Sequence, residues 1–119
     1  MAPTPDIDLA RMQAAAAQAC TLLKALANPD RLLLLCQLSQ GEHCVGELEQ
    51  RLGIRQPTLS QQLAVLREHG LVRTRRDGTS IHYAIASSEA LAVMQVLYEQ
   101  FCACDVQAEN HPEERSEQC

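Results

Sequence analysis

Six cysteines are the residues of this 119-residue chain best suited to chemistry. They are Cys20, Cys36, Cys44, Cys102, Cys104 and Cys119. A cysteine thiolate can bind a soft metal or react with an oxidant, and a free cysteine can also be buried as a small hydrophobic side chain. The first residues resemble no export signal, and no apolar run approaches the roughly 18 residues of a membrane span. We therefore expect a cytoplasmic protein, without membrane contact, whose thiols are not a disulfide framework.

A second group of residues could read nucleic acid. Between residues 55 and 69, Leu59, Leu63 and Leu66 fall on one face of a helix. The opposite face carries Arg55, Gln56, Thr58, Gln61 and Gln62, with Ser60 near its edge. Glutamine can bond an adenine edge, arginine a guanine edge, and a hydroxyl either a base or a phosphate. The competing interpretation is an ordinary solvated polar face.

The charge distribution supports contact with phosphate. The chain has a net charge of −5, yet residues 51–82 hold six arginines against two acids, a local charge of +4. Arg75 and Arg76 suit phosphate or minor-groove contacts. A winged module that binds only proteins is an alternative, which steep salt dependence of DNA binding would exclude.

Catalysis is not expected. The chain has no glycine-rich phosphate loop and no paired catalytic acids, and its four histidines form no recognisable triad. We therefore predict neither an enzyme nor a cofactor.

The elements that must position these residues follow from periodicity. Leu9, Met12, Ala16, Ala19, Leu23 and Leu26 form one stripe of a helix. Asn28-Pro29 ends that helix and starts another, Pro29 to Ser39, which is apolar nearly all round. Residues 44–52 and 57–68 form two short helices joined at Gly53. Alternating strands at 71–76 and 79–85 flank the hairpin pair Asp77-Gly78, and Ser87 or Ser88 caps a last helix ending near Cys102.

The predicted fold is mainly α with a two-stranded β-wing, a winged helix-turn-helix in the order α-α-α-α-β-β-α. Its core must be aliphatic, because the chain has no Trp, one Phe and two Tyr. We expect a flexible lead at 1–8, one DNA-binding and dimerisation domain at 9–104, and a mobile acidic tail at 105–119. One copy reads only a few base pairs, so a homodimer on an inverted repeat of double-stranded operator DNA is expected. The helix stripe at 9–26 and the remaining apolar face of the last helix offer the dimer surface.

From about Thr21 to Phe101 the chain resembles the ArsR/SmtB repressors. The motifs that carry the resemblance are LKALANPDRL, the VGELEQRLG…LSQQLAVLREHGLV block and the RRDG wing. Gln62 is a departure, since the family commonly has His there. The resemblance implies a repressor whose DNA affinity falls when an inducer acts.

Metal induction is the weaker implication of this resemblance. The last helix, 87–101, has no His and two glutamates, which does not fit the zinc-type sites. Arsenic-type members carry Cys-Val-Cys, where this chain has Cys44-Val45-Gly46. An arsenite or soft-metal site would need Cys44 with recruited ligands, or Cys102, Cys104 and Cys119 together.

Cys36 and Cys102 stand where the persulfide- and redox-responsive branch of the family has its two reactive cysteines. The LLLLCQL context and Phe101 extend that resemblance. It implies a switch by thiol oxidation or persulfidation, with reactive sulfur species or oxidants as the inducer. Cys36 could instead be a buried hydrophobic residue. Cys20, Cys104 and Cys119 are expected to be bystanders, although Cys104 could resolve a modified Cys102.

Overall fold

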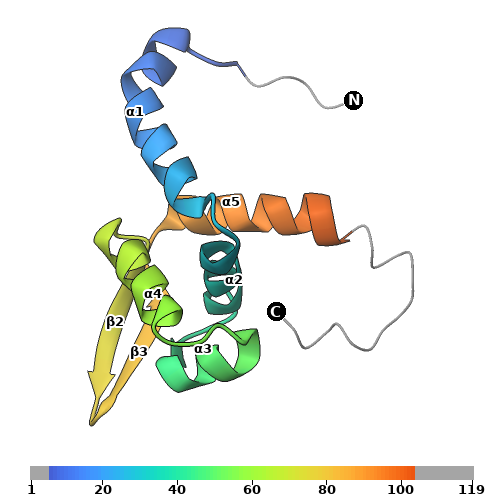
Figure 1. Ribbon diagram of the computed structural model, residues 1–119. Coiled ribbons are helices and arrows are strands. Elements are labelled where there is room, and N and C mark those ends of the chain that lie inside the picture. The colour runs from blue at the N-terminus through green and yellow to red at the C-terminus, as the bar shows by residue number, and fades with distance from the viewer. Residues whose placement is uncertain (1–5, 104–119) are drawn as a thin grey trace.

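The computed structural model describes residues 6–103, which form a winged helix-turn-helix (Figure 1). The elements are α1 (Leu9–Leu26), α2 (Pro29–Leu38), β1 (His43–Cys44), α3 (Val45–Leu52), α4 (Thr58–Glu68), β2 (Val72–Asp77), β3 (Ser80–Ile85), α5 (Ser88–Tyr98) and a π-helical turn, η1 (Glu99–Ala103). The predicted fold class is confirmed. Within the described residues no helix has the length and apolarity required to cross a membrane.

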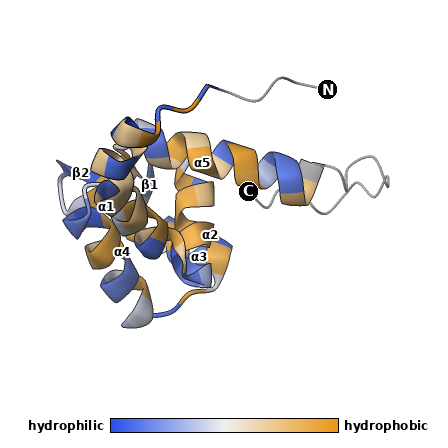
Figure 2. Cartoon of the chain, turned by 90° about the horizontal axis from the view of Figure 1, so that it is seen from above, coloured by the Kyte–Doolittle hydropathy of each residue, from blue (hydrophilic) through white to orange (hydrophobic). Residues whose placement is uncertain are grey.

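Helix α2 occupies the centre of the domain. It contacts α1, α3, α4, α5 and β3, and in Figure 2 its ribbon has mainly the colour of hydrophobic residues. Its leucine run explains this position, because a helix apolar nearly all round has no face suited to solvent. Leucines fill the core as the composition predicted; those that are fully buried are Leu34, Leu35, Leu48, Leu59, Leu63 and Leu66.

Side-chain caps fix where the helices begin. The Asn28 side-chain oxygen accepts the backbone N–H of Arg31 at 3.0 Å, and Pro29 occupies the first turn of α2. The Ser87 hydroxyl likewise accepts the N–H of Ala90 at 3.0 Å and starts α5. Of the two serines proposed as caps, Ser87 is therefore the one used.

The wing is the predicted hairpin with one strand added. β2 and β3 pair antiparallel from Val72↔Ile85 to Asp77↔Ser80, and Gly78 at the tip has φ +66°. β1 pairs with the other edge of β3, giving the order β1-β3-β2. β1 was not predicted from the sequence, because two residues are too few for an alternating pattern to be recognised.

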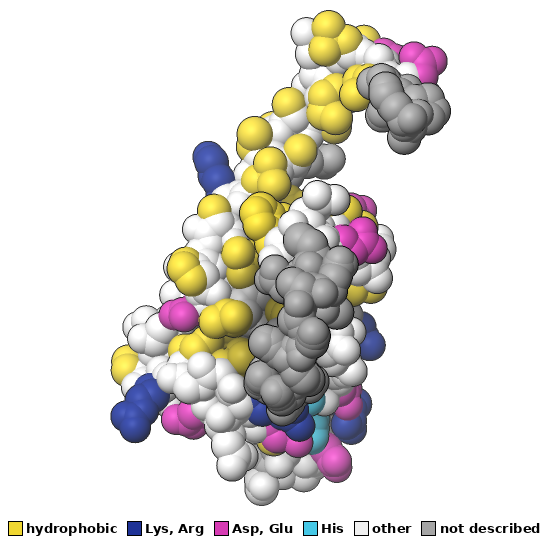
Figure 3. All heavy atoms as spheres, turned by 90° about the vertical axis from the view of Figure 1, so that its right-hand side faces the viewer, with side chains coloured by type: hydrophobic (Ala, Val, Ile, Leu, Met, Phe, Trp, Pro, Cys, Tyr) yellow, Lys and Arg dark blue, Asp and Glu magenta, His cyan; other side chains and the backbone are white. Residues whose placement is uncertain are grey.

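Helix α1 extends away from the body of the domain (Figure 1). Only Ala25 and Leu26 at its C-terminal end are buried, whereas Leu9, Met12 and Leu23 are exposed. Figure 3 shows hydrophobic side chains along this arm and continuing onto the body. The amphipathic stripe predicted from the sequence is therefore formed but is uncovered within a single chain.

Candidate DNA interface and thiol pocket

Helix α4 exposes the predicted reading face. Leu59, Leu63 and Leu66 are buried, so the side chains on the other side of the helix face outward. Arg55, Gln56, Ser60 and Gln61 are exposed, and Thr58 and Gln62 are half-buried. α3 precedes α4 through Gly53, whose φ of +72° allows the turn between the two helices.

Two of these polar residues bond one another. The Gln56 side-chain oxygen accepts the Ser60 hydroxyl at 2.7 Å and the Ser60 backbone N–H at 3.2 Å. Gln56 thereby satisfies a backbone N–H in the first turn of α4, the part of a recognition helix that meets base edges.

The side chain of Gln62 is bonded by Arg31, a residue that was not predicted from the sequence to belong to the site. Arg31, at the start of α2, donates from Nη1 to Gln62 Oε1 at 2.7 Å. Its Nε and Nη2 donate to the carbonyls of Ala25 at 2.6 Å and Lys24 at 3.3 Å. Arg31 therefore ties the end of α1, the start of α2 and the middle of α4 together. Its only sequence signal was its place in the LKALANPDRL motif.

The arginines of the wing differ in their surroundings. Arg75 forms two hydrogen bonds with the Glu42 carboxylate, at 2.7 and 3.1 Å, and Asp77 lies 4.0 Å away. Arg73 donates to the Ile85 carbonyl at 2.9 Å. Arg76 is exposed beside the hairpin tip.

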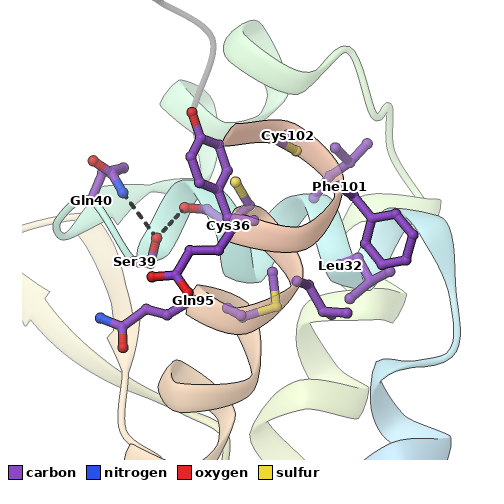
Figure 4. A pocket seen from close by; sticks show the side chains of 12 residues that line it. Leu32, Cys36, Ser39, Gln40, Gln95, Phe101 and Cys102 are labelled. Atoms are coloured by element: carbon purple, nitrogen blue, oxygen red, sulfur yellow. Dashed lines mark hydrogen bonds between the residues drawn. The ribbon is translucent and has the colours of Figure 1, made fainter. Parts of the chain in front are cut away.

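The second feature is a pocket of about 770 Å³ between α2 and the end of α5 (Figure 4). Its lining is mainly apolar and includes both Cys36 and Cys102. Cys36 is half-buried and packs against the core, whereas Cys102 is exposed on η1. Figure 4 shows both sulfur atoms at this pocket, together with Phe101. Two thiols that are 66 positions apart in the sequence are thus brought to one site.

Two further cysteines among the described residues lie outside this pocket. Cys20 is exposed on α1, and Cys44 is half-buried where β1 meets α3. Within residues 6–103 no three His, Cys, Asp or Glu side chains are grouped so that they could hold a metal ion. Cys104 and Cys119, proposed as partners of Cys102 in an arsenite site, fall outside the described residues.

Comparison with known proteins assigns this geometry to a family. Residues 28–74 match the family described as "Bacterial regulatory protein, arsR family". The chain is 53% identical over 98 residues to the Biofilm growth-associated repressor of Agrobacterium fabrum, covering 82% of this chain and 84% of that protein. The chain belongs to the arsR family of bacterial regulatory proteins. It is accordingly a transcriptional regulator that binds DNA through a winged helix.

Solved structures of similar proteins agree with the fold. The transcriptional repressor BigR from Xylella fastidiosa superimposes with a TM-score of 0.78 at 48% identity, over 81% of this chain and 98% of that one. A homodimeric winged helix-turn-helix DNA-binding domain from Mycobacterium bovis gives a TM-score of 0.67 at 32% identity, over 93% and 98%.

Proposed function

We propose that this arsR-family protein is a dimeric repressor whose operator affinity is switched by oxidation or persulfidation of Cys36 and Cys102. The observation that carries the proposal is the shared pocket, which brings the two thiols together from α2 and η1. In this proposal the residues that contact DNA are Arg55, Gln56, Thr58, Ser60, Gln61, Gln62 and Arg76, and Arg75 contacts it only when it is released from Glu42.

The sulfur chemistry needs an oxidant from outside. The Cys36 thiolate attacks a polysulfide, breaks one of its S–S bonds and becomes a persulfide, while the shortened polysulfide leaves. The Cys102 thiolate then attacks the Cys36 sulfur and releases hydrosulfide. The product is a Cys36–Cys102 disulfide. The two thiols lose two protons and two electrons, and the polysulfide is reduced.

Such a link has a route to the DNA-binding face. It would tie η1 at the end of α5 to α2, the helix that packs against α4. α2 also carries Arg31, which bonds Gln62 on α4. A shift of α2 therefore changes the support of the recognition helix. A coupling of about 1–3 kcal/mol, roughly 5- to 150-fold in affinity, is sufficient for a switch.

Dimerisation is supported by the apolar surface that a single chain leaves uncovered. Exposed hydrophobic side chains follow α1 and the end of α5, namely Leu9, Met12, Leu23, Val96, Tyr98 and Phe101. Contiguous exposed apolar surface marks an interaction site. The M. bovis neighbour is described as homodimeric, and a dimer would place two α4 helices for the halves of an inverted repeat.

The test follows the thiols and DNA binding in the same samples. The reduced protein is treated separately with polysulfide, diamide and arsenite, its intact mass is measured, and its affinity for operator DNA selected from a random pool is determined. We expect polysulfide or diamide to form an intramolecular Cys36–Cys102 link and to weaken binding at least fivefold.

Matched serine variants test which thiols are required for the link and for the change in DNA affinity. The Cys36→Ser protein should lose both the link and the weakening of operator binding. The Cys20→Ser protein, which lacks an exposed thiol on α1, should keep both. Tight arsenite binding with a Cys36→Ser protein that is still inducible would contradict the proposal and transfer sensing to Cys44 or the C-terminal cysteines.

A further inference from the structure

Among the described residues of the wing, the ion pair with the shortest N···O distance joins two residues far apart in the sequence. Glu42 lies immediately before β1, and Arg75 lies on β2. The guanidinium donates from Nη2 to Oε1 at 2.7 Å and from Nε to Oε2 at 3.1 Å, a bidentate arrangement. Their side chains are 35% and 53% exposed, so the pair lies at the surface of the wing.

The three-stranded sheet explains how these residues meet. Cys44 of β1 and Arg75 of β2 are both paired with His82 of β3, on its two sides. Residues in one cross-strand row project from the same face of a sheet. The Arg75 side chain therefore lies across β3 toward the carboxylate that precedes β1, and the added strand β1 is what brings Glu42 within reach.

Both side chains of the pair are charged at neutral pH. The hydrogen bonds from Arg75 lower the pKa of Glu42, and the carboxylate raises the pKa of Arg75. A carboxylate with two oxygens offers a guanidinium the same fork-shaped contact that a phosphate group offers. Glu42 therefore binds the Arg75 guanidinium with the same two-pronged contact that a DNA phosphate would make.

We propose that Glu42 is an intramolecular substitute for a DNA phosphate, which withholds Arg75 from the operator and so limits the DNA affinity of the wing. The proposal rests on DNA binding by the winged helix and is independent of the thiol switch. Arg76, exposed next to the tip, is left as the wing arginine that reaches DNA. Each protomer then neutralises one phosphate fewer than its arginines would allow.

The salt dependence of DNA binding measures the number of phosphates that the protein neutralises. The slope of the logarithm of the binding constant against the logarithm of the salt concentration becomes steeper by about 0.9 for each additional phosphate. The full-length reduced protein, with Glu42→Gln and the control Glu49→Gln, is titrated with operator DNA between 50 and 200 mM salt at pH 8. Glu49 lies on α3 and loses the same charge without releasing Arg75. We expect Glu42→Gln to steepen the slope by about 1 to 2 per dimer and to raise affinity several-fold at the lowest salt. Glu49→Gln should leave the slope unchanged.

The double variant Glu42→Gln with Arg75→Ala isolates the mechanism. Its slope should return to that of Arg75→Ala alone. A Glu42→Gln slope equal to the wild type, a loss of affinity, or a gain that persists without Arg75 would overturn the inference while leaving the repressor function intact. Failure of the wild-type protein to bind DNA would overturn the proposed function, and this inference with it. Thermal melting of every variant confirms that the fold is retained.

Discussion

The Arg31 guanidinium donates a 2.7 Å hydrogen bond to the side-chain oxygen of Gln62. Arg31 and Gln62 are 31 positions apart, and this bond links the start of α2 to the outward side of the recognition helix. A glutamine reads adenine with its oxygen as acceptor and its nitrogen as donor. The oxygen of Gln62 already accepts a hydrogen bond from a cation, so we expect its amide N–H groups to make any contact with DNA, and these suit acceptors such as phosphate.

Neighbouring glutamines should therefore behave differently when they are truncated. Gln62→Ala removes the acceptor from a half-buried guanidinium, and we expect it to lower the free energy of unfolding by about 1.5–3 kcal/mol. Gln61→Ala, at an exposed position, should change stability by less than about 0.5 kcal/mol and weaken operator binding. Urea denaturation and DNA titrations with operator and scrambled sequence provide the two measurements. If Gln62→Ala leaves stability unchanged and abolishes discrimination at one base pair, the result would contradict the role given to the Arg31–Gln62 hydrogen bond.

The leucine run of α2 provides a second matched pair. Leu34 is fully buried, whereas Leu33 beside it is 43% exposed at the pocket. Leu34→Ala leaves a cavity in the centre of the domain and should lower the free energy of unfolding by about 2–5 kcal/mol. Leu33→Ala should lower the free energy of unfolding by less than about 1.5 kcal/mol, because the Leu33 side chain has less buried apolar surface to lose. Urea denaturation at equal protein concentration makes the comparison, and equal losses would be inconsistent with the described core.

The arm formed by α1 allows a direct test of the dimer. Met12 is half-exposed on the apolar stripe, and Gln13 is exposed beside it. Burying a carboxylate in an apolar interface without a partner is strongly unfavourable. We therefore expect Met12→Glu to shift the protein from dimer to monomer in sedimentation velocity. Gln13→Glu, which adds the same charge off the stripe, should remain dimeric. Dissociation of both variants to the same extent would indicate a general charge effect instead.

Local patterns in the sequence predicted the helices, the wing and the face of α4. Leucine spacing, Asn28-Pro29 and Asp77-Gly78 each report on neighbours a few residues away, and the structure has those elements. Contacts between distant segments could not be obtained in this way. Neither the Arg31–Gln62 bond nor the Glu42–Arg75 pair has a local signature, since each depends on how α2, α4 and the strands pack. The meeting of Cys36 and Cys102 was implied only by the family resemblance, and the pocket gives it a physical setting.

The last prediction concerns acid stability at the start of α3. Glu47 Oε1 accepts the backbone N–H of Cys44 at 3.0 Å and contacts His43 Nδ1 at 3.3 Å. The bond from Cys44, with a further contribution from His43, lowers the pKa of Glu47 below its ordinary value of 4.5. A carboxyl group whose pKa is lowered by folding stabilises the folded state above its unfolded pKa, and this contribution is lost as the pH falls through the folded value.

The stability difference between the wild type and Glu47→Gln should therefore be constant near neutral pH and shrink as the pH falls below about 4.5. Urea midpoints measured from pH 7 to pH 3 follow this difference. Glu49→Gln removes the same charge two residues further along α3, where no such bond to the helix start exists, and is the control. A difference that stays constant down to pH 3 would show that the carboxylate of Glu47 does not stabilise the start of α3.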